Sequence, residues 1–170
     1  MEFLNSIKDR MPEYAKDIRL NLDGVIARSS LAPEIALGVA LAAAFAAKSK
    51  PLIDAFKAAM PPAEGHAALT AATLMGMNNV WYPFVEMAED DELKTMRAEL
   101  RMNAYATSGG VAKLKFEAFA LAASIVGKCH FCVKSHYELL KKEGMTTQQL
   151  RDVGRIAAVV NSAAQALAAE

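Results

Sequence analysis

The feature that most constrains the fold is that no stretch of this chain alternates apolar and polar residues over the length of a β-strand. Helix signals recur instead, with proline or capping residues where helices begin and glycine where they end. Alanine accounts for 34 of the 170 residues, and it is the residue that costs least in a helix and lets helix backbones approach closely. The pattern predicts an all-α fold, a single-domain helical bundle over residues 1–170.

Start and stop residues predict the helix boundaries. A helix over residues 12–22 is expected to stop at Asp23-Gly24, and Gly76 is expected to separate two further helices. Thr146 with Gln149 matches a capping box that opens the last helix. The other helices are expected over residues 34–48, 51–60, 63–74, 79–88, 92–105, 113–126 and 129–142, with the last one ending near residue 168.

Charge and hydropathy exclude several classes of protein. Lys plus Arg and Asp plus Glu both number 19, and no long run carries one sign, which argues against a nucleic-acid or anionic-membrane partner. The first 19 residues interleave charges with apolar residues and lack the apolar core of a signal peptide. The longest apolar run, residues 35–47, has 13 residues, whereas a membrane-spanning helix needs about 20. We therefore expect a cytoplasmic protein with neither a nucleic-acid nor a membrane partner.

Both cysteines lie in one motif. Cys129, Cys132 and His136 form the pattern Cys-x-x-Cys-x-x-x-His. On a helix, offsets of three and seven residues place these side chains along one stripe. The cysteines follow Gly127 and fall in the first turn of their helix, where free amides and the helix dipole stabilise a thiolate. Because cytosolic thiols are normally kept reduced, the pair is redox-active, metal-binding or inert rather than a structural staple.

Glu117 can join this motif only if the chain turns back on itself. It lies twelve residues before Cys129, about 18 Å away along a straight helix. If the chain turns at Gly127 into a helical hairpin, Glu117, ten residues before the turn, faces His136, nine residues after it. Glu117 can then accept a hydrogen bond from one imidazole nitrogen, so that the other takes the thiol proton of Cys132, directly or through one water. Cys129 would be the second thiol of a dithiol/disulfide pair.

Other readings of these residues remain open at this point. Zinc could bind through the cysteines, although four ligands are usual and no second Cys pair exists. Glu117 could belong to a solvated face beside Lys113 and Lys115, and His130 is expected to be a surface residue. No glycine-rich nucleotide loop is present, so neither NADPH nor flavin is expected. The candidate zinc ligands are Cys129, Cys132, His136 and either Glu117 or His130.

Two apolar surfaces predict burial in the core or between subunits. The faces of residues 35–47 and 156–169 contain more alanine than one exposed helix would display, so an oligomer is plausible. Residues 75–82, which combine methionines with asparagines and aromatics, also fit a core or a subunit interface better than a cofactor site.

The spacing Glu-x11-Cys-x-x-Cys-x-x-x-His, with PEYAKDI at residues 12–18, MGMNN at 75–79 and LRMN at 100–103, resembles the alkyl hydroperoxide reductase AhpD family. That family belongs to the carboxymuconolactone decarboxylase-like group, and the resemblance spans nearly the whole chain. It implies an AhpD-like helical domain, a homotrimer, and a redox motif within residues 111–143.

The resemblance also implies an activity. It is that of an antioxidant thiol-disulfide oxidoreductase with alkyl hydroperoxidase activity, without a bound cofactor or metal. Electrons would come from dihydrolipoamide on a lipoylated 2-oxoacid dehydrogenase component, and they would reduce organic hydroperoxides or the peroxiredoxin AhpC. The alternatives are a decarboxylase-like enzyme of the same broad group and a zinc-stabilised helical module.

The same resemblance assigns roles to four residues. Cys132 would form the sulfenic acid or the mixed disulfide, and Cys129 would donate a proton and resolve it, which makes Cys129-Cys132 the redox disulfide. His136 would be the general base, oriented by Glu117. Some family members carry a histidine just before the second cysteine, where this chain has Phe131, so the role of that histidine is not carried over to His130.

Overall fold

The computed structural model describes all 170 residues and contains helices but no strands, which confirms the all-α class. No helix is both long enough and apolar enough to cross a membrane. Three short 3-10 helices, η1 (Glu2–Leu4), η2 (Glu13–Ala15) and η3 (Ser108–Gly110), accompany ten α-helices. The α-helices are α1 (Asn5–Lys8), α2 (Lys16–Ala27), α3 (Pro33–Ala46), α4 (Lys50–Ala58), α5 (Pro62–Ala88), α6 (Asp91–Thr95), α7 (Asn103–Ala106), α8 (Lys113–Gly127), α9 (His130–Lys142) and α10 (Thr147–Ala168).

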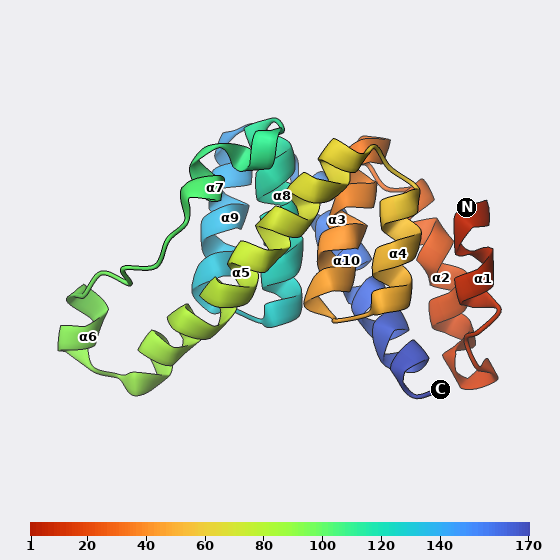
Figure 1. The fold of residues 1–170 in the computed structure, drawn as a ribbon, viewed down its shortest axis with the longest axis horizontal. Helices are drawn as coiled ribbons and strands as arrows, with labels where there is room; N and C mark the ends of the chain where they lie inside the picture. The colour runs from red at the N-terminus through yellow and green to blue at the C-terminus, as the bar shows by residue number, and fades with distance from the viewer.

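Helices α3 and α8 form the centre of the bundle, and α5 and α10 pack against both of them. Figure 1 shows α5 running diagonally across α8 and α3, with α9 on one side of the bundle and α1, α2 and both chain termini on the other. The short helix α6 stands away from the bundle at the end of α5, and an extended segment returns from it to α7. We call residues 91–102, which comprise α6 and this extended segment, the arm.

The central pair of helices explains the alanine content. Nine consecutive residues of α8, from Phe116 to Ser124, are buried, and α3 is buried along most of its length. A Cβ atom at Gly38 of α3 would lie 2.2 Å from the ring of Phe119, so only glycine allows the two helices to approach this closely. The small side chains let α3 and α8 pack closely at the centre of the core, as the alanine-rich faces predicted.

Two predicted helix breaks were wrong. Helix α2 continues through Gly24 to Ala27, and Leu22, Val25 and Ile26 are buried on this stretch. Helix α5 continues through Gly76 and Pro83 as one helix, in place of the two predicted over residues 63–74 and 79–88. A single glycine costs a helix only about 1 kcal/mol relative to alanine, and burial of neighbouring apolar side chains outweighs that cost.

The helix predicted over residues 92–105 was also wrong. The chain forms only the short helices α6 and α7 there, joined by extended backbone. No residue of α6 is buried, and Met96 and Leu100 are exposed. Short helices without a packed face are marginal in water. Asp90 caps α6 and acidic residues occupy its first turn, but this local stabilisation sustains a helix of only five residues.

The helical hairpin expected at Gly127 is present. Helix α8 ends at Gly127, Lys128 adopts a left-handed conformation with φ 55°, and α9 follows with Cys129 as its N-cap. A Cβ atom at Gly127 would lie 2.0 Å from the side-chain nitrogen of Asn79, which donates to the carbonyl oxygen of Ala123 at 3.1 Å. The glycine therefore allows α5 to pack directly against the end of α8. The capping box of Thr146 with Gln149 is confirmed at the start of α10.

Candidate functional site

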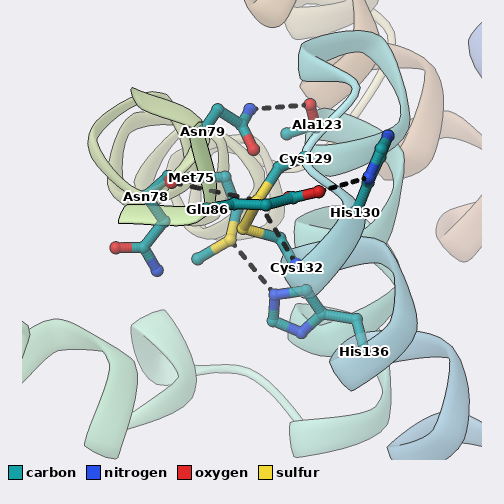
Figure 2. Close-up of a disulfide and its surroundings, with 9 residues drawn as sticks. All are labelled: Met75, Asn78, Asn79, Glu86, Ala123, Cys129, His130, Cys132 and His136. Atoms are coloured by element: carbon teal, nitrogen blue, oxygen red, sulfur yellow. Dashed lines mark hydrogen bonds and ion pairs between the residues drawn. A yellow bond between two sulfur atoms is a disulfide. The ribbon is translucent and has the colours of Figure 1, made fainter. Parts of the chain in front are cut away.

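A disulfide joins Cys129 and Cys132 at the N-terminus of α9. The Sγ atom of Cys129 also caps the helix, because it accepts a hydrogen bond from the amide of Cys132 at 3.3 Å. Figure 2 shows α5 beside the pair, with the carbonyl oxygen of Asn78 3.9 Å from the Sγ of Cys129. Both cysteines are buried, and Cys132 is 2% exposed. The sulfurs are therefore held by α9 and α5 together, next to free amides of the helix terminus that favour a thiolate.

Glu117 and His136 meet on the facing helices of the hairpin. The Nδ1 atom of His136 lies 2.6 Å from Oε2 of Glu117, and the carboxylate residue is 2% exposed. Burial opposes ionisation of the carboxyl, but hydrogen bonds from His136 and Tyr105 outweigh burial and hold the pKa of Glu117 below its ordinary value. The structure thus brings together the two residues that the hairpin argument paired. It also rules out the alternative of Glu117 on a solvated face.

Tyr105 completes the surroundings of this carboxylate, and the sequence analysis missed it. Its hydroxyl donates to Oε1 of Glu117, and its ring packs edge-on against Phe116, with the ring centroids 5.7 Å apart. Burial, together with the neighbouring Glu117 carboxylate, raises the pKa of the phenol. Tyr105 was placed at the end of a helix that does not form, and no spacing in the sequence links it to the cysteine motif. Only the path of the arm brings it to α8.

Met75 is the second residue that the sequence analysis did not place in the site. Its thioether Sδ lies 3.1 Å from Nε2 of His136 (Figure 2). In this disulfide form His136 makes no hydrogen bond to Cys132, so Nε2, the nitrogen expected to face the thiol, contacts Met75 instead. The sequence had indicated a core or interface role for residues 75–82, and the burial of Met75 fits a core position.

A cavity of about 340 Å³ opens beside Cys132 and His136. Most of its wall is apolar, and Tyr82 and Phe131 stack on one side with ring centroids 4.1 Å apart. The cavity is large enough for a small organic molecule, which would then lie next to Cys132. The lining residues are Asn78, Tyr82, Met102, Tyr105, Ala106, Phe131, Cys132, Ser135 and His136.

The two residues between the cysteines have different surroundings. His130 is 82% exposed and its Nδ1 lies 3.1 Å from Oε1 of Glu86 on α5 (Figure 2). Phe131 is half-exposed at the mouth of the cavity. His130 therefore lies at the surface, apart from the pair of His136 and Glu117. No three His, Cys, Asp or Glu side chains are grouped as metal ligands would be.

Comparison with known proteins places the C-terminal half of the chain in a broad protein family. Residues 91–170, which contain the disulfide, Glu117 and His136, match the Carboxymuconolactone decarboxylase family. Over the whole chain the relatives share a more specific name. Alkyl hydroperoxide reductase AhpD of Rhodospirillum centenum is 41% identical over 98% of this chain and 91% of its own length. The AhpD proteins of Maricaulis maris (41% identical, 98% of both chains) and Rhodopseudomonas palustris (38% identical, 98% of this chain and 93% of its own) are similar to the same extent.

The chain therefore belongs to the alkyl hydroperoxide reductase AhpD family. The resemblance seen in the sequence is confirmed by these matches at nearly full length.

Proposed function

We propose that the protein is a cytoplasmic thiol-disulfide oxidoreductase that reduces organic hydroperoxides, regenerates the peroxiredoxin AhpC, or does both. The observation that carries the proposal is the Cys129-Cys132 disulfide at a helix N-terminus, with the buried pair of His136 and Glu117 beside it. The name shared by the relatives, alkyl hydroperoxide reductase AhpD, supports the same reaction class. The apolar cavity beside Cys132 suits an alkyl hydroperoxide better than a strongly hydrated substrate.

The peroxidase half-reaction begins with both cysteines reduced. His136, oriented by Glu117, takes the thiol proton of Cys132, and the thiolate attacks one oxygen of the hydroperoxide. The O–O bond breaks, an alcohol leaves with the proton from His136, and Cys132 becomes a sulfenic acid. The thiol of Cys129 then attacks this sulfur. The Cys129-Cys132 disulfide forms, and the hydroxyl of the sulfenic acid leaves as water with the proton of Cys129.

The reductive half-reaction needs a dithiol from outside the chain, and we propose dihydrolipoamide on a lipoylated 2-oxoacid dehydrogenase component. One donor thiolate attacks the protein disulfide and forms a mixed disulfide, which the second donor thiol resolves. Two electrons and two protons pass to the protein, so both cysteines become thiols and the donor leaves as lipoamide. In the adaptor role, the Cys132 thiolate attacks the disulfide of AhpC in place of a peroxide. No cofactor or metal is part of either half-reaction.

We also propose that the chain assembles with copies of itself, as a homotrimer by analogy with the family. Val80, Phe84 and Met87 follow one another at helical spacing on α5 and are exposed, and Met96 and Leu100 of the arm are exposed as well. The end of α5 and the arm project away from the bundle (Figure 1). A second copy of the chain is the occupant proposed for this surface.

The test of the proposed function is consumption of an organic hydroperoxide with dihydrolipoamide as the reductant, measured with and without AhpC. Turnover without AhpC indicates a peroxidase in its own right, and turnover only with AhpC indicates an adaptor. Cys132→Ser is the matched control and should remove both. If the wild-type protein is inactive in both assays, the redox proposal is wrong.

A second measurement tests the base. Iodoacetamide labelling of the reduced protein should require a higher pH in His136→Ala than in the wild type, because the thiolate loses its proton acceptor. Identical labelling profiles would contradict the role of His136.

A further inference from the structure

Each oxygen of the Glu117 carboxylate has one donor, and the two donors come from different parts of the chain. Oε2 faces His136 of α9, and Oε1 accepts from the hydroxyl of Tyr105 on α7. We propose that Tyr105 is a positioning residue, whose hydroxyl keeps Glu117 ionised and oriented so that Oε2 remains on His136. The inference rests on the redox function proposed above and adds to it a residue outside the cysteine motif.

The carboxylate needs this second partner because it is buried. The terminal torsion of a glutamate is broad, so a single hydrogen bond does not fix which oxygen faces His136. A buried oxygen without a donor also disfavours the charged form of the carboxyl. The Tyr105 hydroxyl meets both needs, since it occupies Oε1 and can donate to a carboxylate.

The position of Tyr105 is fixed by packing rather than by a long helix. Helix α7 has four residues, and the aromatic ring is held by the edge-on contact with Phe116 and by the His136 ring, whose centroid lies 6.3 Å away. The side chain lines the same cavity as Cys132 and His136. Its hydroxyl makes no hydrogen bond other than the one to Glu117.

Few other groups act on this carboxyl. Those that favour its charged form are His136 of α9, Tyr105 of α7 and Lys113 of α8 itself, and Lys113 also pairs with Glu143 at the surface. No titratable side chain of α3, α5 or α10 is among them. Loss of the Tyr105 hydroxyl therefore leaves Glu117 with one close donor, and its pKa should rise.

The test is the pH profile of iodoacetamide labelling at Cys132, measured in a Cys129→Ser background so that only one thiol reacts. Tyr105→Phe removes the hydroxyl and keeps the ring. We expect the midpoint of the profile to move up by about 0.5 to 1 pH unit, and labelling at pH 7 to fall about three- to tenfold, because a Glu117 carboxylate that is no longer held in place on Nδ1 supports proton uptake by His136 less well. Tyr137→Phe is the matched control, since this hydroxyl makes no hydrogen bond, and its profile should equal that of the parent.

A double variant separates positioning from a general structural effect. In a Glu117→Gln background the Tyr105→Phe change should shift the profile no further, because the charge through which Tyr105 acts is already gone. Superimposed profiles for Tyr105→Phe and the parent would overturn the proposal. A further shift in the Glu117→Gln background would also overturn it, because Tyr105 would then act by another route.

Two features keep the test independent of folding and of the proposed activity. Circular dichroism reports whether Tyr105→Phe keeps its helices. If it does not, 3-fluorotyrosine at position 105 supplies a stronger donor and should move the midpoint down, so an unchanged midpoint would overturn the proposal. Labelling uses no peroxide, dihydrolipoamide or AhpC, so a protein without peroxidase or adaptor activity still gives a readable result for Tyr105.

Discussion

The molecule buries two carboxylates, Asp152 of α10 and Glu117 of α8, and surrounds them with different kinds of donor. One oxygen of Asp152 accepts from the amide and the hydroxyl of Ser30, both at 2.8 Å, and the other accepts from Arg151 and Arg155 at 3.1 Å. Burial opposes its ionisation, yet these bonds lower the pKa of Asp152 to about 2. Guanidinium, amide and hydroxyl donors do not give up their protons near neutral pH, so we interpret the cluster as an anchor that ties the chain between α2 and α3 to α10.

Glu117 has fewer donors, and one of them can exchange its proton. Histidine is the type of side chain that most readily gains and loses a proton near neutral pH, and His136 lines the cavity beside Cys132. A buried, ionised carboxylate is thus not in itself the mark of a reactive site. The difference lies in the partner: arginine and backbone amides fix a structure, whereas histidine next to a cavity and a thiol can take part in a reaction.

The largest expected effect separates the two carboxylates by activity. Glu117→Gln should lower hydroperoxide turnover with dihydrolipoamide about 100-fold, because His136 loses the group that orients it as a base. Asp152→Asn should leave turnover within about twofold, since an anchor far from the thiol carries no catalytic contribution. Steady-state assays of both variants check this, and equal losses would remove the distinction.

The next prediction concerns stability, and here Asp152 matters more than Glu117. Asp152→Asn should lower the free energy of unfolding by about 2 to 3 kcal/mol, because it removes the charge that accepts five hydrogen bonds. Glu117→Gln should cost less, because the amide oxygen can still accept from Tyr105 or His136. Urea unfolding followed by circular dichroism compares the two. A less stable Glu117→Gln variant would reverse the assignment of anchor and site.

The pH dependence of stability gives a smaller but specific signature. The pKa of Asp152 lies below its ordinary value of 3.8, so its stabilising contribution is present above 3.8 and is lost as the pH falls toward 2. Asp152→Asn should flatten the loss of stability in this interval. Acid titration of helicity in both proteins measures it. Parallel curves would show that other carboxylates dominate acid unfolding.

The smallest effect comes from removing one neutral donor. Ser30→Ala deletes one hydroxyl from Asp152 and keeps the backbone amide of Ser30 in place, so it should cost about 1 kcal/mol of stability and leave turnover unchanged. Urea unfolding and the peroxide assay on one preparation test both parts. A loss of turnover without a loss of stability would contradict a purely structural role for this cluster.

The sequence predicted those parts of the site that depend on local spacing. The cysteine motif, the turn at Gly127 and the nearly equal distances of Glu117 and His136 from it were enough to place these two side chains together. In a helical hairpin, residues equally far from the turn lie opposite each other on the two helices. The capping box at the start of α10 was also predicted correctly, because the whole motif lies within four consecutive residues.

The sequence did not predict what depends on long-range packing. Gly24 and Gly76 were predicted to end helices. The burial of neighbouring side chains in α2 and α5 stabilises the continuous helices by more than a single glycine destabilises them. A long helix was predicted over residues 92–105, but the start of that segment has no buried face to sustain it. Tyr105 and Met75 reach the site from separate elements at no fixed spacing from the cysteines, so only the three-dimensional path of the chain reveals them.

The extended part of the arm has a consequence for how the protein can be handled. Arg97 and Arg101 are exposed on backbone that makes no helical hydrogen bonds. Proteases cut such segments first, so trypsin should nick a free subunit there before it attacks the bundle. A neighbouring copy packed over Met96 and Leu100 would shield both arginines. The rate of cleavage in the arm, measured at several protein concentrations, would therefore report assembly without a label or a sizing column.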